Sequence, residues 1–206
     1  HNHRPSIDQP VPANLVEYDP LWPSNANLIR YDIVVQSQGN EHPARLTPQR
    51  LLSQCSVQRS RGSGPGGQHR NKVQTRIVIR HQPTGIIAEA SERRSQKENL
   101  DTAVFRLRVN MALEFRAPPQ DPQHPSPLWM SRCKNGQLTV NPRHRDFPAL
   151  LAEALDVAAR HDMTVKPTAE FLGCTASQLT RFLKLEPRAL KQVNDQRRAT
   201  GKRPLL

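Results

Sequence analysis

Aromatic residues, acidic residues and long apolar runs are scarce in this sequence. Aromatic side chains make up 4% of the 206 residues, and 18 Asp and Glu stand against 30 Lys and Arg, for a formal net charge of +12. Such a charge excess lies on the surface and attracts polyanions such as RNA. No run approaches the roughly 20 apolar residues of a membrane helix, and no signal-peptide pattern opens the chain. We therefore expect a soluble, cytoplasmic protein with no membrane partner, and leave an organellar location open.

Cysteine is also scarce. The chain has only Cys55, Cys133 and Cys174, an odd number without a C-x-x-C pair. Neither a disulfide framework nor a zinc cage follows from such isolated thiols. We expect small buried hydrophobic residues, no metal site and no cofactor, because free cysteine usually packs in this way.

The proline distribution divides the chain. Residues 1–44 are proline-rich and poor in apolar runs, so we expect a largely extended segment that does not offset the entropy of ordering. Residues 28–36 are β-branched and aromatic, which is typical of an edge strand. A second proline-rich stretch begins at Pro118. It predicts a stiff linker over 118–145, with a hairpin at Asn135-Gly136.

Residues 45–117 predict a small α+β unit. Thr47 is suited to the N-cap of a short helix, strands follow at 55–59 and 75–81, and residues 86–90 return after a turn. Ser95 and Glu98 form a capping box. Apolar residues then recur at helical spacing, which predicts one long helix packed on a mixed sheet, through Leu100, Ala103, Val104, Leu107, Met111 and Phe115.

Residues 146–206 predict a basic helical RNA-binding domain and tail. One stripe of apolar residues faces a core, through Leu150, Leu151, Ala154, Leu155 and Ala158. Gly173 then separates two short helices, with Ala169 and Leu172 before it and Leu179, Phe182 and Leu183 after it. This spacing is typical of a helix-turn-helix, although a simple helical hairpin has the same pattern.

The stretch "RGSGPGGQHRNKVQTR" has four glycines and no acidic residue. Between Arg59 and Arg80 only His69 could act as a base, so catalysis by side chains is poorly supported, and we interpret His69 as a loop residue or phosphate contact. The glycines allow a close approach of main-chain amides, which can stabilise developing negative charge. The alternative for a bare Gly-Gly-Gln is a surface turn with solvated charges.

The sequence "SGPGGQHRNKVQTRIVIRHQPTGI", followed by "RRSQKENLDTAVFRL", resembles the catalytic domain of the class I peptide chain release factor family. Within that family it is most similar to the codon-independent ribosome-rescue peptidyl-tRNA hydrolases. The resemblance covers about Cys55 to Phe115. It implies an extended Gly-Gly-Gln loop that enters the peptidyl transferase centre of the large ribosomal subunit and promotes water attack on peptidyl-tRNA.

The resemblance also implies residue roles. Gly66, Gly67 and Gln68 would be catalytic, Gln68 is a candidate for N-methylation, and the protein would act as a monomer with peptidyl-tRNA and ribosomal RNA. A stop-codon reader would carry further domains, which residues 1–44 cannot hold, so we expect no codon reading. The basic carboxy-terminal region would occupy the messenger channel. The expected RNA contacts are Arg59, Arg61, Arg70, Lys72, Arg76, Arg188, Lys191, Arg197, Arg198, Lys202 and Arg203.

Two other functions stay open at this point. One is a stop-codon-dependent termination factor that reads codons through an unrecognised region or a partner. The other is a non-catalytic nucleic-acid-binding protein that uses the helix-turn-helix-like segment.

Overall fold

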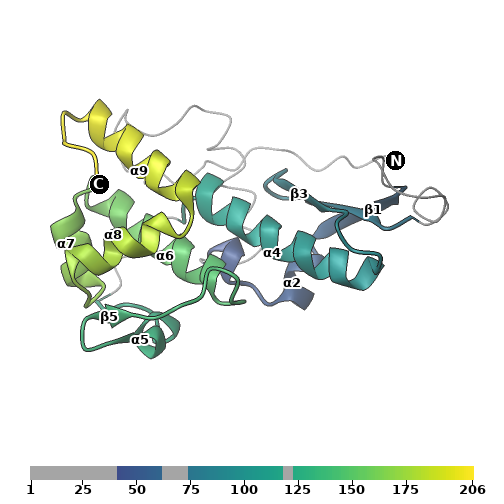
Figure 1. The fold of residues 1–206 in the computed structure, drawn as a ribbon, viewed down its shortest axis with the longest axis horizontal. Coiled ribbons are helices and arrows are strands. Elements are labelled where there is room, and N and C mark those ends of the chain that lie inside the picture. The colour runs from purple at the N-terminus through teal and green to yellow at the C-terminus, as the bar shows by residue number, and fades with distance from the viewer. Residues whose placement is uncertain (1–40, 62–73, 118–122) are drawn as a thin grey trace, which may run out of the picture.

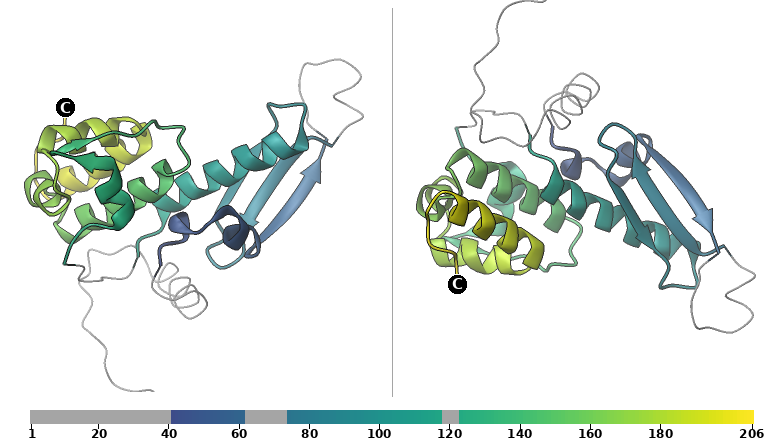
Figure 2. Two further views of the ribbon diagram at one scale, coloured as in Figure 1. Left: turned by 90° about the horizontal axis from the view of Figure 1, so that it is seen from below. Right: turned by 90° about the horizontal axis from the view of Figure 1, so that it is seen from above.

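The computed structural model describes residues 41–61, 74–117 and 123–206. The strand expected at 28–36 and the Gly-Gly-Gln loop lie outside these ranges. Within them the chain forms a small sheet at one end and a group of helices at the other, with the long helix α4 (Gln96–Glu114) running between (Figures 1 and 2). The expected α+β class, with one long packing helix and a helical carboxy-terminal part, is confirmed.

The sheet contains β1 (Cys55–Ser60), β2 (Arg76–His81) and β3 (Ile87–Ala90) in that order. Both pairings are antiparallel, so the expectation of a mixed sheet is corrected for the part of the chain that is described. A tight turn between β2 and β3 explains this, because antiparallel neighbours can be joined by a short hairpin. Ile77 and Ile79 of β2 are buried together with Ala88 and Ala90 of β3.

The turn between β2 and β3 is held by a buried histidine. The ring of His81 contacts Thr84 Oγ1 through Nδ1 at 2.8 Å and Gln54 Oε1 through Nε2 at 3.0 Å. Gly85 closes the turn with a φ of 71°, a left-handed angle that favours glycine. Burial lowers the pKa of His81 to about 4, so the ring is neutral near pH 7. The sheet is thereby tied to the short helix α2 (Pro48–Leu52) through Gln54 just beyond it.

Helix α2 and helix α4 begin as the sequence predicts. Thr47 is the N-cap of α2, and its Oγ1 accepts a hydrogen bond from Arg50 N at 3.4 Å. Ser95 is the N-cap of α4, and its Oγ accepts from Glu98 N at 3.3 Å. Each hydroxyl satisfies a main-chain N–H that lacks an intrahelical partner.

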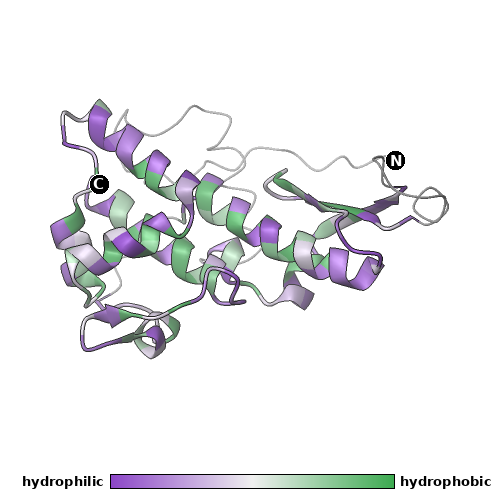
Figure 3. Cartoon of the chain, in the orientation of Figure 1, coloured by the Kyte–Doolittle hydropathy of each residue, from purple (hydrophilic) through white to green (hydrophobic). Residues whose placement is uncertain are grey.

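Helix α4 is buried on more than the one face that its apolar spacing predicts. It packs against β2 and β3, and it also contacts α6 (Phe147–Arg160) and the 3-10 helix η1 (Pro43–Arg45). The residues from Met111 to Leu113 are therefore buried consecutively. Figure 3 shows hydrophobic residues interspersed with hydrophilic ones along the length of α4. Helix α4 thus contributes side chains to one continuous hydrophobic core, together with the sheet, η1 and α6.

The region after α4 holds more regular structure than a linker with a hairpin. Helix α5 (Pro127–Arg132) precedes the two-residue strands β4 (Cys133–Lys134) and β5 (Gln137–Leu138). The expected hairpin forms, and Asn135 and Gly136 have φ angles of 50° and 76°. Trp129 of α5 is fully buried, and its Nε1 donates to Leu172 O at 2.7 Å.

The remaining helices are α7 (Val165–Phe171), α8 (Ala176–Lys184) and α9 (Pro187–Ala199). The apolar stripe predicted for α6 is buried, as are the inward residues predicted for α7 and α8. The cysteines are half-buried rather than buried, and burial raises the pKa of Cys55 and of Cys174 to about 11. The division of the chain into four segments stays a prediction. The buried core cluster contains residues from Ala44 to Val193 and so crosses the predicted boundaries.

Buried polar groups join these elements. The carboxylate of Glu153 in α6 accepts from Arg45 Nη2 and from Ser126 N, both at 2.7 Å, and from Ser126 Oγ. The Arg116 guanidinium donates to Ala112 O and Leu113 O at 2.7 Å, at the carboxy-terminal end of α4, where a positive charge is favourable.

The buried ring of His42 predicts a pH dependence of stability. Its Nδ1 accepts from Ala44 N at 3.0 Å and its Nε2 contacts Phe115 O at 3.2 Å. Burial, and secondarily the charge of Arg116, lowers the His42 pKa to about 3. Because the unfolded ring binds a proton near pH 6.5, this stability is complete above that pH and is lost below it.

We expect His42 alone to lower the free energy of unfolding by about 2 kcal/mol between pH 7 and pH 5. Urea unfolding of the wild type and of His42→Phe at both pH values measures this change. The variant should lose less stability on acidification, since other titrating groups are common to both proteins. Equal losses in the two proteins would contradict the prediction.

Candidate functional site

Segment 62–73, which carries Gly66, Gly67 and Gln68, begins and ends at one end of the sheet. Ser60 at the end of β1 pairs with Arg76 at the start of β2. The structure therefore brings together the two points from which the segment departs. Gly66, Gly67, Gln68, Arg70 and Lys72 themselves lie outside the described residues.

The first turn of α4 fixes the point where the chain re-enters β2. Asn99 is fully buried, and its Nδ2 donates to Thr75 O at 2.6 Å and to Arg93 O at 2.9 Å. Its Oδ1 accepts from Arg93 N at 2.9 Å. Gln96 Nε2 adds a bond to Gln74 O at 2.6 Å. Helix α4 thus positions residues 74 and 75 through side-chain amides.

Sequence reasoning missed Asn99. An asparagine inside a helix is unfavourable unless its amide has another partner, and this was the available signal. Its partners are main-chain groups 6 and 24 residues away, which no local pattern reveals.

The basic residues expected around this segment differ in their contacts. Arg59 and Arg61 are exposed, and neither side chain has a polar partner among the described residues. Arg76 is half-exposed, and its Nη2 lies 2.5 Å from Glu89 Oε2 on the neighbouring strand. Arg59 and Arg61 are therefore among the described cations of this end that can meet an external anion.

The carboxy-terminal cations belong to a folded helix rather than to a free tail. Ala189 and Val193 of α9 are buried. Arg197 Nη1 donates to Met163 O at 2.6 Å, and Lys202 Nζ donates to Asp162 O at 2.5 Å. Both side chains thus hold the carboxy-terminal segment against the end of α6 and the start of α7.

The other expected carboxy-terminal contacts are exposed. Lys191 and Arg198 both pair with Asp195, at 2.6 and 3.1 Å. Arg188 contacts Glu186 at 2.8 Å, while Arg203 is exposed. Figure 1 shows α9 and β1 at opposite ends of the molecule, so the expected cations form two separate groups.

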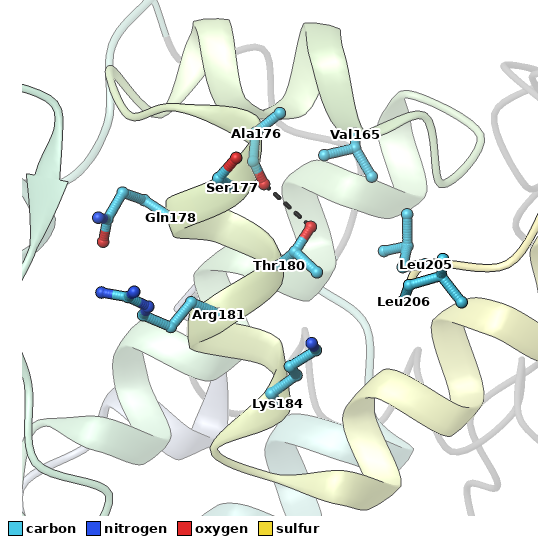
Figure 4. A pocket seen from close by; sticks show the side chains of 9 residues that line it. All are labelled: Val165, Ala176, Ser177, Gln178, Thr180, Arg181, Lys184, Leu205 and Leu206. Carbon is cyan, nitrogen blue, oxygen red and sulfur yellow. Dashed lines mark hydrogen bonds between the residues drawn. The ribbon is translucent and has the colours of Figure 1, made fainter.

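Helices α7 and α8 form the helix-turn-helix-like segment. Gly173 makes the turn with a φ of 65°, and Thr175 caps α8 by accepting from Gln178 N at 3.2 Å. Figure 4 shows Gln178, Arg181 and Lys184 on α8, around a surface pocket of about 590 Å³. Arg181 and Lys184 are exposed and have no polar partner in the part of the chain that is described. Sequence reasoning assigned the helix but did not include these two cations.

Two kinds of feature are absent from the described residues. No group of three or more His, Cys, Asp or Glu side chains there is arranged to hold a metal ion. None of the described helices is long and apolar enough to cross a membrane.

A comparison with protein families identifies the region around this site. Residues 52–137 match the family model of the RF-1 domain, so the match includes β1, the Gly-Gly-Gln segment, β2, β3 and α4. This region is therefore similar to the RF-1 domain family. The match also includes helix α5 and the start of the hairpin beyond α4.

Several proteins that are similar to this region are named as peptide chain release factors or as a release factor-like protein. The chain is 36% identical over 83 residues to the uncharacterized peptide chain release factor-like protein YLR281C, mitochondrial, of Saccharomyces cerevisiae, covering 39% of this chain and 53% of that protein. It is 47% identical over 51 residues to peptide chain release factor 1 of Xylella fastidiosa and 45% identical over 51 residues to peptide chain release factor 2 of Buchnera aphidicola. Each match covers 25% of this chain and 14% of the relative. The chain thus spans about half of the yeast protein.

We expect Asn99→Ala to lower the free energy of unfolding by about 1–3 kcal/mol, because it leaves buried main-chain groups without partners. Gln96→Ala is the matched control: its amide makes one exposed bond, so the loss should stay below about 1 kcal/mol. Urea unfolding at pH 7 measures both. Equal stabilities of the two variants would contradict the role assigned to Asn99.

Proposed function

We propose that this protein hydrolyses the ester bond of peptidyl-tRNA on the ribosome and releases the nascent peptide without reading a codon. The observation that carries the proposal is the Gly-Gly-Gln sequence at residues 66–68, inside the matched RF-1 domain and between two paired strands. Its partners would be the peptidyl transferase centre of the large subunit, ribosomal RNA and peptidyl-tRNA.

The proposed reaction uses a main-chain group. Water attacks the ester carbonyl carbon, the bond to the tRNA 3′ oxygen breaks, and negative charge develops on the oxygens. The N–H of Gln68 would donate to this charge, which is worth about 3–4 kcal/mol for such a donor in a site closed to water. Gly66 and Gly67 would allow the backbone to approach, because they have no side chains. The Gln68 side chain would admit water and exclude larger nucleophiles.

The scarcity of acidic and basic catalytic side chains near Gln68, where His69 is the one titratable base, supports this use of a main-chain group. Between Arg59 and Arg80 the sequence has no carboxylate and no cysteine. RNA groups of the ribosome would supply the rest of the reaction centre, and Arg59 and Arg61 would contact phosphates beside it.

The names of the relatives are compatible with two kinds of release, one independent of the codon and one dependent on a stop codon. The yeast relative is named a release factor-like protein, whereas two other relatives are named peptide chain release factors 1 and 2. The folded, cationic carboxy-terminal region supports codon-independent action, since its exposed cations are suited to RNA. Stop-codon-dependent termination is the second candidate function, favoured by the names of those two relatives. The unpartnered Arg181 and Lys184 favour a third, non-catalytic nucleic-acid binding.

Changes at Gln68 test the reaction. Gln68→Pro removes the main-chain N–H and should slow peptide release by about 100-fold or more. Gln68→Ala keeps that N–H, so it should slow release to a smaller extent. Release of labelled peptide from purified ribosomes gives the rates, and cosedimentation with ribosomes is the control for binding. Full release by Gln68→Pro, with normal binding, would refute the mechanism.

The codon mode is tested by comparing ribosomes with an empty, a sense or a stop codon in the decoding site. We expect release from the empty site to be the fastest. Release only with a stop codon would instead establish termination, and no release from any complex, together with binding of RNA, would favour the non-catalytic function.

A further inference from the structure

A groove lined by arginines lies between α2, α4 and residues 143–146. Two hollows of about 800 and 780 Å³ adjoin there and share Pro48, Arg108 and Arg145. Helix α2 contributes Pro48 and Leu52, and α4 contributes Phe105 and Arg108. None of the expected RNA contacts that the structure describes lines this groove.

Arg108 is a buried charge with no carboxylate within ion-pair distance in the described ranges, and the Asp146 carboxylate acts on it only from farther away. The residue is only 8% exposed. Its guanidinium donates to two neutral main-chain carbonyls. Nε donates to Ala44 O at 2.9 Å, and Nη1 donates to Arg145 O at 2.6 Å. Within the described ranges, Nη2 has no hydrogen bond. A buried cation is costly unless an anion compensates it, so this position favours a bound anion.

The acidic residues around the groove are mostly engaged elsewhere. Asp146 lies 2.6 Å from Arg132, and Glu92 lies 2.7 Å from Arg106. Glu41 lies 3.7 Å from Arg50. Asp101 is the exposed exception, with no partner in the described part of the chain. Arg108 therefore has only the Asp146 carboxylate, which Arg132 already holds, as a nearby opposite charge among the described residues.

Two exposed arginines flank Arg108. The side chain of Arg145 is 89% exposed, and its Nε is only weakly paired, at 3.7 Å, with the Asp146 carboxylate that Arg132 already holds. Arg143 is exposed, and its side chain has no polar partner among the described residues. Both guanidiniums line the same hollow as Arg108. Arginine is well suited to this arrangement, because its planar donors match two oxygens of one phosphate.

Apolar surface in the groove distinguishes RNA from a free anion. Leu52 and Phe105 are half-buried and line the hollow beside the arginines. An inorganic anion would not use this surface, whereas a nucleotide presents a ribose and the face of a base, which stacks on aromatic side chains.

We propose that this groove binds the phosphodiester backbone of RNA, with one phosphate on Arg108 between Arg143 and Arg145. The inference deepens the proposed function and rests on its RNA partner, because it assigns part of the ribosomal RNA contact to a surface outside segment 62–73.

The test uses the full chain and a fluorescein-labelled hairpin of ribosomal RNA. Arg143→Ala/Arg145→Ala removes the two exposed cations and keeps the Arg145 carbonyl that braces Arg108. Lys134→Ala/Lys166→Ala is the matched control, since it removes two exposed, unpartnered cations outside the groove. Fluorescence anisotropy gives the affinity of each protein over a range of salt concentrations.

We expect the groove variant to bind about tenfold more weakly at low salt. The slope of log K against log salt should become shallower by up to about 0.7–0.9, because the variant loses the two cations that help Arg108 to neutralise one phosphate. The control should change less in both measures. Equal losses of affinity in the two variants would overturn the proposal, because they would indicate general attraction by net charge.

A second arm separates RNA from a free anion. Inorganic phosphate is added to the wild type and the groove variant, and the melting temperature is followed. Stabilisation by phosphate that depends on the groove, together with unchanged RNA affinity of the groove variant, would overturn the assignment to RNA. The binding assay contains no peptidyl-tRNA. A groove variant that binds RNA normally would therefore contradict the groove proposal and not the release reaction. A protein that releases no peptide would contradict the release reaction, and the binding assay would still test the groove.

Discussion

Burial of helix α4 from several sides is the constraint on which the rest of the structure depends. The helix packs against the sheet through β2 and β3, and it also contacts α6 and η1. The same helix presents Asn99 and Gln96 to the chain beside the Gly-Gly-Gln segment and Arg108 to the groove. A single rigid element therefore links the point of proposed chemistry with the proposed RNA contacts.

The proposed catalytic segment and the cationic helices have different physical tasks. The ends of segment 62–73 are fixed by strand pairing and by neutral amides. This arrangement keeps the Arg59 and Arg61 charges free for an external partner. At the other end, Arg197 and Lys202 serve the fold through carbonyl contacts, so exposed cations such as Arg203, Arg181 and Lys184 are better placed to meet RNA.

Local signals in the sequence predicted much of the fold. Thr47, Ser95 and Asn135-Gly136 each act through neighbours within a few residues, so the two N-caps and the hairpin were predictable. Helix α5 was missed because it is short and lies among prolines, and its stability comes from Trp129 reaching Leu172. The parts of the site that escaped prediction, Asn99 and Arg108, depend on partners distant in sequence, which no spacing encodes.

The central claim is that a main-chain donor of the protein enters a reaction centre made of RNA. The most direct test is a cryo-electron microscopy structure of the protein on a ribosome that carries a non-hydrolysable peptidyl-tRNA. We expect the Gln68 N–H to lie about 3 Å from an oxygen at the acylated end of the tRNA. A bound complex in which residues 66–68 lie far from that end, in every state observed, would contradict it.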